Sequence, residues 1–289
     1  MRFPLFFAAV AVCTVAITVG GCAIVVVSDD GNVHASGNST VRGDGQYTTE
    51  NRTVGAIDRL ELQGSVQMEV RVGAAPSLRV EADGNLLPLV RTDTVDGTLT
   101  VWLASGFHSD TPVRVLLTTP QLTQIHASGS GRLTVSGLHG APLRVELDGS
   151  RKTVLAGTVG PLSIRQQGSG GIDATALVSG STDAGVFGSG RLELGQVVGQ
   201  QLRLEMQGSG GVRASGTVQA VRVSMHGSGS AELIGLRSQT ADLQTQGSGD
   251  MVVTVLGTLL ADSNGSGHIT VHGEPDQRGV QGRNVRIVP

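Results

Sequence analysis

The feature that most constrains the fold is a Gly-Ser-Gly triplet that recurs through the second half of the chain. Successive copies begin 18 to 20 residues apart, and a variant, Gly149-Ser150-Arg151, stands in the place of one copy. A unit of this length cannot bury an apolar face by itself, so neighbouring units must stack on one another. The repeat therefore predicts a solenoid. The intact triplets begin at Gly129, Gly168, Gly188, Gly208, Gly227, Gly247 and Gly265.

Each repeat has the hydrophobic pattern of short β-strands. Leu143, Val145 and Leu147 alternate with Arg144 and Glu146, and a second, shorter alternating segment follows each triplet. Alternation with a period of two sends one set of side chains to a core and the other to water. Two strands of about five residues and two turns fill one repeat, and stacking at about 4.8 Å gives parallel sheets. We therefore predict an all-β, single-domain parallel β-helix.

The triplet itself predicts a corner of the solenoid. Glycine tolerates positive φ and a close approach of neighbouring turns, and serine can hydrogen-bond locally. A glycine-rich phosphate loop needs a helix directly downstream, and no helical pattern follows any triplet. The segment Gly168–Asp173 resembles a calcium-binding nonapeptide only faintly, because the period differs and Asp does not recur.

The N-terminus reads as a bacterial lipoprotein signal. Met1-Arg2 precedes an uncharged apolar run, Phe3–Val19, and Val19-Gly20-Gly21-Cys22 has the form of a lipobox. We expect residues 1–21 to be a signal peptide and Cys22 to carry the lipid that anchors the protein to a membrane. An uncleaved membrane anchor and a plain signal peptide are the alternatives.

Cleavage before Cys22 would leave a mature chain without disulfides, because the other cysteine, Cys13, is lost with the peptide. Residues 22–50 are expected to form a flexible tether, because Ser28 to about Glu50 is rich in Gly, Ser, Asn and Asp. Ile24–Val27 could form a short strand or lie in the lipid interface. Ala23, in place of Asp, favours sorting to the outer membrane of a two-membrane cell.

Residues 51–275 are predicted to form one solenoid domain. Up to Pro120 the strand pattern is present, but only Gly64-Ser65 resembles the corner, so this part should be less regular and should close the first edge. Gly273-Glu274-Pro275 is expected to end the last strand, which leaves residues 276–289 as a polar, basic tail.

Composition argues against several classes of partner. The net charge of −3 and the absence of a basic patch give no reason to expect nucleic acid. Aromatic residues make up 2% of the chain, which limits stacking on sugars, and only four lie beyond the signal peptide. These are Tyr47, Trp102, Phe107 and Phe187.

The sequence predicts no catalytic residue, no cofactor site and no metal site. Histidines lack metal-ligand spacing, and the serines lack a nucleophile elbow between a strand and a helix. Four acidic residues near Pro- and Gly-containing loops could form a carboxylate pair that cleaves glycans, but turn residues are the favoured interpretation. They are Asp83, Asp93, Asp96 and Asp110. The histidines are His34, His108, His126, His139, His226, His268 and His272.

From Thr53 to Pro275 the chain resembles the bacterial family of putative auto-transporter adhesins with a head GIN domain. The resemblance rests on Val54–Leu62, on Val80–Pro88 and on the serial Gly-Ser-Gly corners. It implies an exported β-helix-like domain, often a lipoprotein, and supplies no catalytic residues. The chain departs from the family pattern at Ser65-Val66 and at Gly149-Ser150-Arg151, which makes the regularity of those two turns uncertain.

These observations lead us to expect a non-catalytic, lipid-anchored envelope protein that acts as a scaffold for a glycan or for an envelope or surface protein. Its oligomeric state and the side of the membrane that it faces stay open. A polysaccharide lyase or hydrolase, and a periplasmic assembly or stress factor that captures extended strands, are the alternatives. Outward side chains that could form the binding face are Arg144, Glu146, Arg203, Glu205 and Arg222.

Overall fold

A computed structural model describes residues 24–27, 33–36, 40–73 and 75–289. The predicted signal peptide and Cys22 lie outside these residues. The chain divides into two compact units, Met1–Thr40 and Val41–Pro289. In the first, β1 (Ile24–Val27) pairs antiparallel with β2 (Val33–Ser36), so the strand considered for Ile24–Val27 is present. Within the described part of the chain we find no helix with the length and apolar character needed to cross a membrane.

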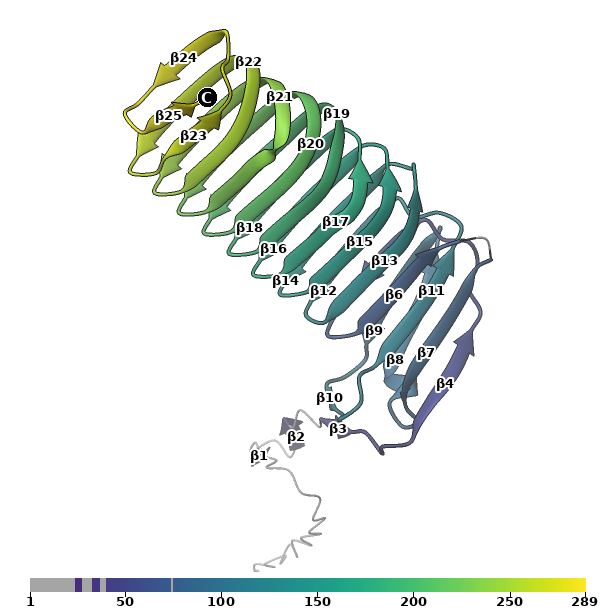
Figure 1. The fold of residues 1–289 in the computed structure, drawn as a ribbon. Helices are drawn as coiled ribbons and strands as arrows, with labels where there is room; N and C mark the ends of the chain where they lie inside the picture. The colour runs from purple at the N-terminus through teal and green to yellow at the C-terminus, as the bar shows by residue number, and fades with distance from the viewer. Residues whose placement is uncertain (1–23, 28–32, 37–39, 74) are drawn as a thin grey trace, which may run out of the picture. The chain divides into compact units, whose positions relative to one another are not determined.

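The second unit is a β-solenoid of about eight turns, as predicted (Figure 1). Each turn gives one strand to each of two sheets. We call the strands that precede the Gly-Ser-Gly corner the first sheet and those that follow it the second sheet. In spatial order, the first sheet begins with β8 (Val90–Val95), β9 (Thr98–Leu103), β5 (Arg59–Leu62), β12 (Gln124–Gly129), β14 (Leu143–Gly149), β16 (Leu162–Gly168) and β18 (Thr182–Gly188).

The second sheet is built in the same way and merges with the first over the later turns. Its order is β4 (Tyr47–Arg52), β7 (Ser77–Asp83), β11 (Arg114–Thr119), β6 (Gln67–Val72), β13 (Arg132–His139), β15 (Lys152–Val159) and β17 (Gly171–Ser179). Four long strands then run from the second sheet into the first: β19 (Arg191–Gly208), β20 (Gly211–Gly227), β21 (Ser230–Gly247) and β22 (Asp250–Gly265).

Stacking in register places equivalent residues above one another. Gly149 pairs with Gly129 on one side and with Gly168 on the other, so the variant triplet does not disturb the repeat. Inward side chains form apolar columns along the axis, such as the one that contains Val145 and Ile164, both at most 2% exposed. Each such side chain contributes about 1.5–3 kcal/mol by leaving water.

The corners explain why glycine recurs. Gly188 has φ of +122°, and a Cβ there would lie 2.5 Å from the carbonyl oxygen of Gly168 in the turn below. The same carbonyl accepts a hydrogen bond from the backbone N–H of Ser189 at 3.1 Å. Only a residue without a side chain allows the two turns to approach closely enough for this bond.

The part before the first triplet is less regular, as predicted, but its strand directions were not foreseen. β7 is antiparallel to β4 and β11, and β8 is antiparallel to β9. Asp96-Gly97, with φ of 48° and 77°, forms the two-residue turn between β8 and β9 that a hairpin requires. The short helix η1 (Leu87–Leu89) follows β7, and β3 (Val41–Arg42) pairs with β10 (Phe107–His108).

The C-terminal end differs from the sequence prediction. Gly273-Glu274-Pro275 does not end the last strand, because β24 (Gln277–Gln281) and β25 (Val285–Val288) follow it and extend the solenoid beyond β22 and β23 (Ile269–His272). The segment 276–289, expected to be a tail, is therefore part of the sheets. Likewise β3 and the start of β4 lie in the range expected to be tether.

Candidate binding surface

The five predicted outward residues lie on the outer side of the first sheet, and several are engaged with neighbours. Arg144 donates from Nε to Oε1 of Glu146 at 2.8 Å, and Arg222 donates from Nε to Oδ2 of Asp242 at 3.0 Å. Hydrogen bonding from Arg144 lowers the pKa of Glu146, although burial of the carboxylate opposes this. Arg203 and Glu205 are exposed on β19.

The second sheet carries a row of residues that the sequence analysis did not single out. In register along the axis, Arg132 lies beside Lys152, Lys152 beside Gly171, and Gly171 beside Arg191. The next residue of the row is Gly211. Each of these residues directly follows a corner triplet, so the three cations stand on the sheet at its corner edge.

A shallow groove of about 610 Å³ lies over this row. Gly171 has no side chain, and the nearest heavy atom to a Cβ built there is 3.9 Å away, so the position is open between its two cationic neighbours. Exposed serines of three successive corners line one side, and two carboxylates line the other. The serines are Ser150, Ser169 and Ser189, and the carboxylates belong to Asp173 and Glu193.

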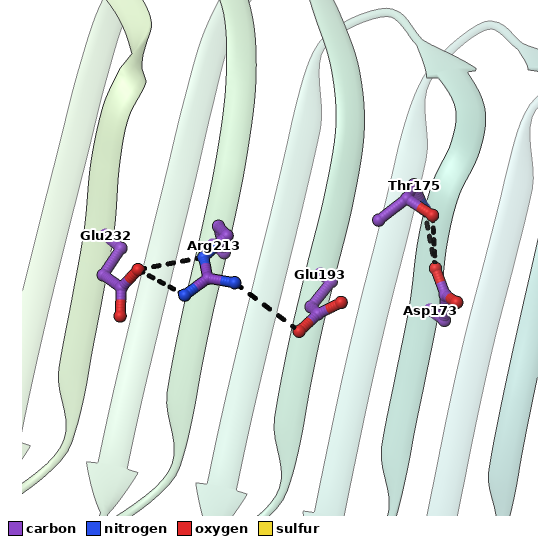
Figure 2. A network of polar contacts seen from close by, with 5 residues as sticks. All are labelled: Asp173, Thr175, Glu193, Arg213 and Glu232. Atoms are coloured by element: carbon purple, nitrogen blue, oxygen red, sulfur yellow. Dashed lines mark hydrogen bonds and ion pairs between the residues drawn. The ribbon is translucent and has the colours of Figure 1, made fainter.

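The two carboxylates already have partners (Figure 2). Asp173 accepts hydrogen bonds from the backbone N–H of Thr175 at 3.0 Å and from its hydroxyl at 2.6 Å, which lower the pKa of Asp173. Glu193 lies 4.0 Å from the guanidinium of Arg213, which also donates to Glu232 at 2.5 and 2.9 Å. These bonds raise the pKa of Arg213.

The cations of the groove differ from the carboxylates in this respect. Arg132, Lys152 and Arg191 are exposed, and among the described residues none of them has an ion-pair partner within 4.0 Å. Three cations against two engaged carboxylates leave the groove with net positive charge. The neighbouring exposed pair of Arg213 and Glu232 contributes little to stability.

The acidic residues considered for catalysis do not assemble a site. Asp83 is 2% exposed and accepts hydrogen bonds from the hydroxyls of Ser109 at 2.6 Å and Thr111 at 2.7 Å, which hold its pKa below the ordinary value. Asp93 lies within β8, Asp96 in the turn after it, and Asp110 in a loop. Among the residues that the structure describes, no three His, Cys, Asp or Glu side chains come together as a metal site would need.

The histidine and aromatic side chains of the unit Val41–Pro289 do not line the groove. His126 and His268 contact carboxylates, those of Glu146 at 3.5 Å and Asp250 at 3.3 Å. Phe187 lies on the first sheet with the guanidinium of Arg165 4.3 Å from its ring centre, a cation–π contact. Among the described residues no aromatic side chain lines the groove, so recognition there depends on polar groups.

The family of the chain is established by its sequence, which agrees with the solenoid fold described above. The family described as "putative auto-transporter adhesin, head GIN domain" matches residues 56–198 and 184–275. These matches cover most of the chain, and the protein belongs to this family. Comparison with functionally curated proteins gives no match.

Several solved structures share the fold, among them the following three. A "putative lipid binding protein" from Parabacteroides distasonis aligns with a TM-score of 0.64 at 20% identity, over 87% of this chain and 100% of that one. A "putative adhesin" from Parabacteroides merdae aligns with a TM-score of 0.62 at 20% identity, over 86% of this chain and 99% of that one. A second "putative adhesin", from Parabacteroides distasonis, aligns with a TM-score of 0.63 at 19% identity, over 86% of this chain and 100% of that one. At these identities the likeness establishes the fold alone.

A signal for the groove was available in the sequence. Aligning the repeats on their triplets puts Arg132, Lys152, Gly171 and Arg191 in one column, directly after the third triplet position. Residues in one column of a solenoid lie on one face in adjacent turns. The outward residues predicted from the alternation all precede the corner and therefore lie on the outer side of the first sheet only.

Proposed function

We propose that this protein is a lipid-anchored envelope protein whose solenoid is a non-catalytic, adhesin-like binding scaffold. The observation that carries the proposal is the set of flat outer sheet faces, on which polar side chains from successive turns stand in register. Such rows present repeated contacts at about 4.8 Å to an extended partner. Family membership and the lipobox at Cys22 support the envelope location.

Protease shaving of intact cells tests the surface part of the proposal. We expect external protease to remove the solenoid while a periplasmic control protein survives. Full protection of the solenoid with an intact control would contradict adhesion and would direct the search to periplasmic partners.

Labelling with a radioactive fatty acid tests the anchor. The wild-type protein should incorporate label and remain with the membrane fraction, whereas Cys22→Ser should do neither. Label on the Cys22→Ser variant, or membrane retention without label in the wild type, would contradict lipidation at this residue.

A second function is favoured by one observation, the open C-terminal end. Among the described residues, β24 and β25 each pair on one side only, and the inward side chain of Val280 is 43% exposed whereas its partner in the turn below, Ala261, is 3% exposed. A free strand edge beside an open core suits the addition of a partner's extended strand. Pro substituted at Val280 should abolish client binding there and leave binding to the flat faces unchanged.

A further inference from the structure

We infer that the groove over Gly171 on the second sheet binds an extended, acidic polysaccharide of the uronic-acid type. This inference names the ligand class of the proposed scaffold and rests on that function. It starts from the row Arg132, Lys152, Gly171 and Arg191, which crosses four consecutive turns. With sheet spacing of about 4.8 Å, the outer two cations stand roughly 14 Å apart along the axis. The site is therefore linear and suits a chain.

The charges of the groove select for spaced negative charge. Arg132, Lys152 and Arg191 provide cations along the groove floor, and the gap at Gly171 leaves the central position open. Arginine and lysine bind carboxylates through charge-assisted hydrogen bonds. A chain whose carboxylates are separated by neutral ring atoms can meet the cations on both sides of the gap.

The remaining lining groups favour a sugar over a polyphosphate. The hydroxyls of Ser150, Ser169 and Ser189 line the groove at successive corners, and none makes a side-chain hydrogen bond within the described chain. Asp173 and Glu193 add carboxylate oxygens that accept hydrogen bonds from sugar hydroxyls. Single-stranded DNA has no hydroxyl along its backbone that could donate to these carboxylates, whereas every unit of a uronic-acid chain does.

The test uses the full-length protein purified in detergent, with oligogalacturonate as the probe and a neutral maltooligosaccharide of equal length as the reference. Calorimetry or fluorescence anisotropy should show that oligogalacturonate binds more tightly than the neutral oligosaccharide. Added salt should weaken this binding, because exposed charges are screened beyond about 10 Å at 0.1 M. Lys152→Glu with Arg191→Glu should weaken binding by at least about tenfold.

Matched controls separate charge and shape from general effects. Arg237→Glu changes an exposed arginine of β21 that lies outside the groove and lacks an ion-pair partner among the described residues, so it should leave the affinity unchanged. Gly171→Leu should fill the groove and abolish binding without a backbone clash. Gly211→Leu places the same side chain in the same row outside the groove and should retain binding. Circular dichroism checks that every variant is folded.

The inference would be overturned by equal affinity for the neutral oligosaccharide, by equal loss in Arg237→Glu and in the groove variants, or by binding of single-stranded DNA as tight as that of oligogalacturonate. Failure to bind oligogalacturonate at all would also overturn it. The proposed function would survive that failure if the wild-type protein still shows surface exposure by shaving and retention of label at Cys22, so the two failures are distinguishable.

Discussion

The guanidinium of Arg151 donates a hydrogen bond from Nη1 to the backbone carbonyl of Val66 at 2.8 Å, across 85 residues of sequence. Its Nη2 donates to the carbonyls of Gly64 at 2.5 Å and Ser128 at 3.3 Å. Arg151 therefore passes close to Gly131, where a built Cβ would lie 3.4 Å from Nη1, and binds the corner of the first turn, which lacks an intact triplet. The two departures from the family pattern, at Ser65-Val66 and at Arg151, are one structural feature.

Replacing Arg151 should destabilise the solenoid. The side chain is 1% exposed, and burial lowers its pKa to about 10, so it remains charged at neutral pH and its donors satisfy three carbonyls. We expect Arg151→Ala to lower the free energy of unfolding by about 2–4 kcal/mol through lost hydrogen bonds and a cavity. Chemical denaturation measures this, with the exposed neighbour substitution Lys152→Ala as control, expected within about 0.5 kcal/mol. Equal midpoints for both variants would contradict the role of Arg151.

Gln166 is a polar residue in the core whose replacement should stabilise the protein. It is 1% exposed, its Nε2 donates to the carbonyl of Gly170, and its Oε1 has no hydrogen-bond partner among the residues that the structure describes. Met206 and Met225 occupy the same inward column two and three turns further on. An unsatisfied buried acceptor costs about 1–3 kcal/mol, so Gln166→Met should raise the melting temperature with a gain of about 1 kcal/mol.

The matched control for Gln166 is Leu147→Met, the same product in the adjacent turn of that column, where no polar group is removed. Volume-conserving exchanges of this kind cost less than about 1.5 kcal/mol. If Gln166→Met melts no higher than the wild type, the Oε1 atom does not destabilise the fold, and the prediction is wrong.

Corner glycines should be intolerant of any side chain. Gly188→Ala introduces a Cβ 2.5 Å from the carbonyl oxygen of Gly168 at φ of +122°, so strain and overpacking should together cost about 2–5 kcal/mol. Gly171→Ala, one turn earlier and free of both problems, should be neutral or stabilising by up to about 0.5–1 kcal/mol. Thermal unfolding of the two variants should differ clearly, and similar melting temperatures would disprove the steric account of the corner.

Asp83 should make stability depend on acid pH. Its hydroxyl partners Ser109 and Thr111 lower the folded-state pKa below the ordinary value of 3.8, so the unfolded chain binds the proton more readily. The stabilisation by the Asp83 carboxylate is present in full above the pKa of the unfolded chain. It is lost as the pH falls through the lower pKa of the folded protein. Unfolding curves from pH 7 to pH 2 should show a smaller acid loss for Asp83→Asn than for wild type. If the free energy of unfolding falls with pH equally in Asp83→Asn and in the wild type, Asp83 does not contribute to the acid dependence.

The sequence determined most of the fold because its information is local and periodic. The interval of 18 to 20 residues, the alternation in each strand and the corner glycines each follow from how a short segment must behave in a stack. The outward positions of Arg144, Arg203 and Arg222 followed from the same alternation and are found in the structure. The groove was missed because alternation shows only which side chains face outward, and the position after the corner carries different residues in different turns.

What the tertiary structure alone decided concerns contacts between turns. Local pattern gives a strand but no direction, so the antiparallel pairings of β7 with β11 and of β8 with β9 are decided by contacts between strands. Pro275 follows the end of β23, yet the chain continues as β24 and β25, which pair with β22 and β23 of the previous turn. Arg151 reaches Val66, and Lys152 faces Arg191 across Gly171, because register aligns residues that are distant in sequence. Register is a property of the whole stack, and no single repeat encodes it.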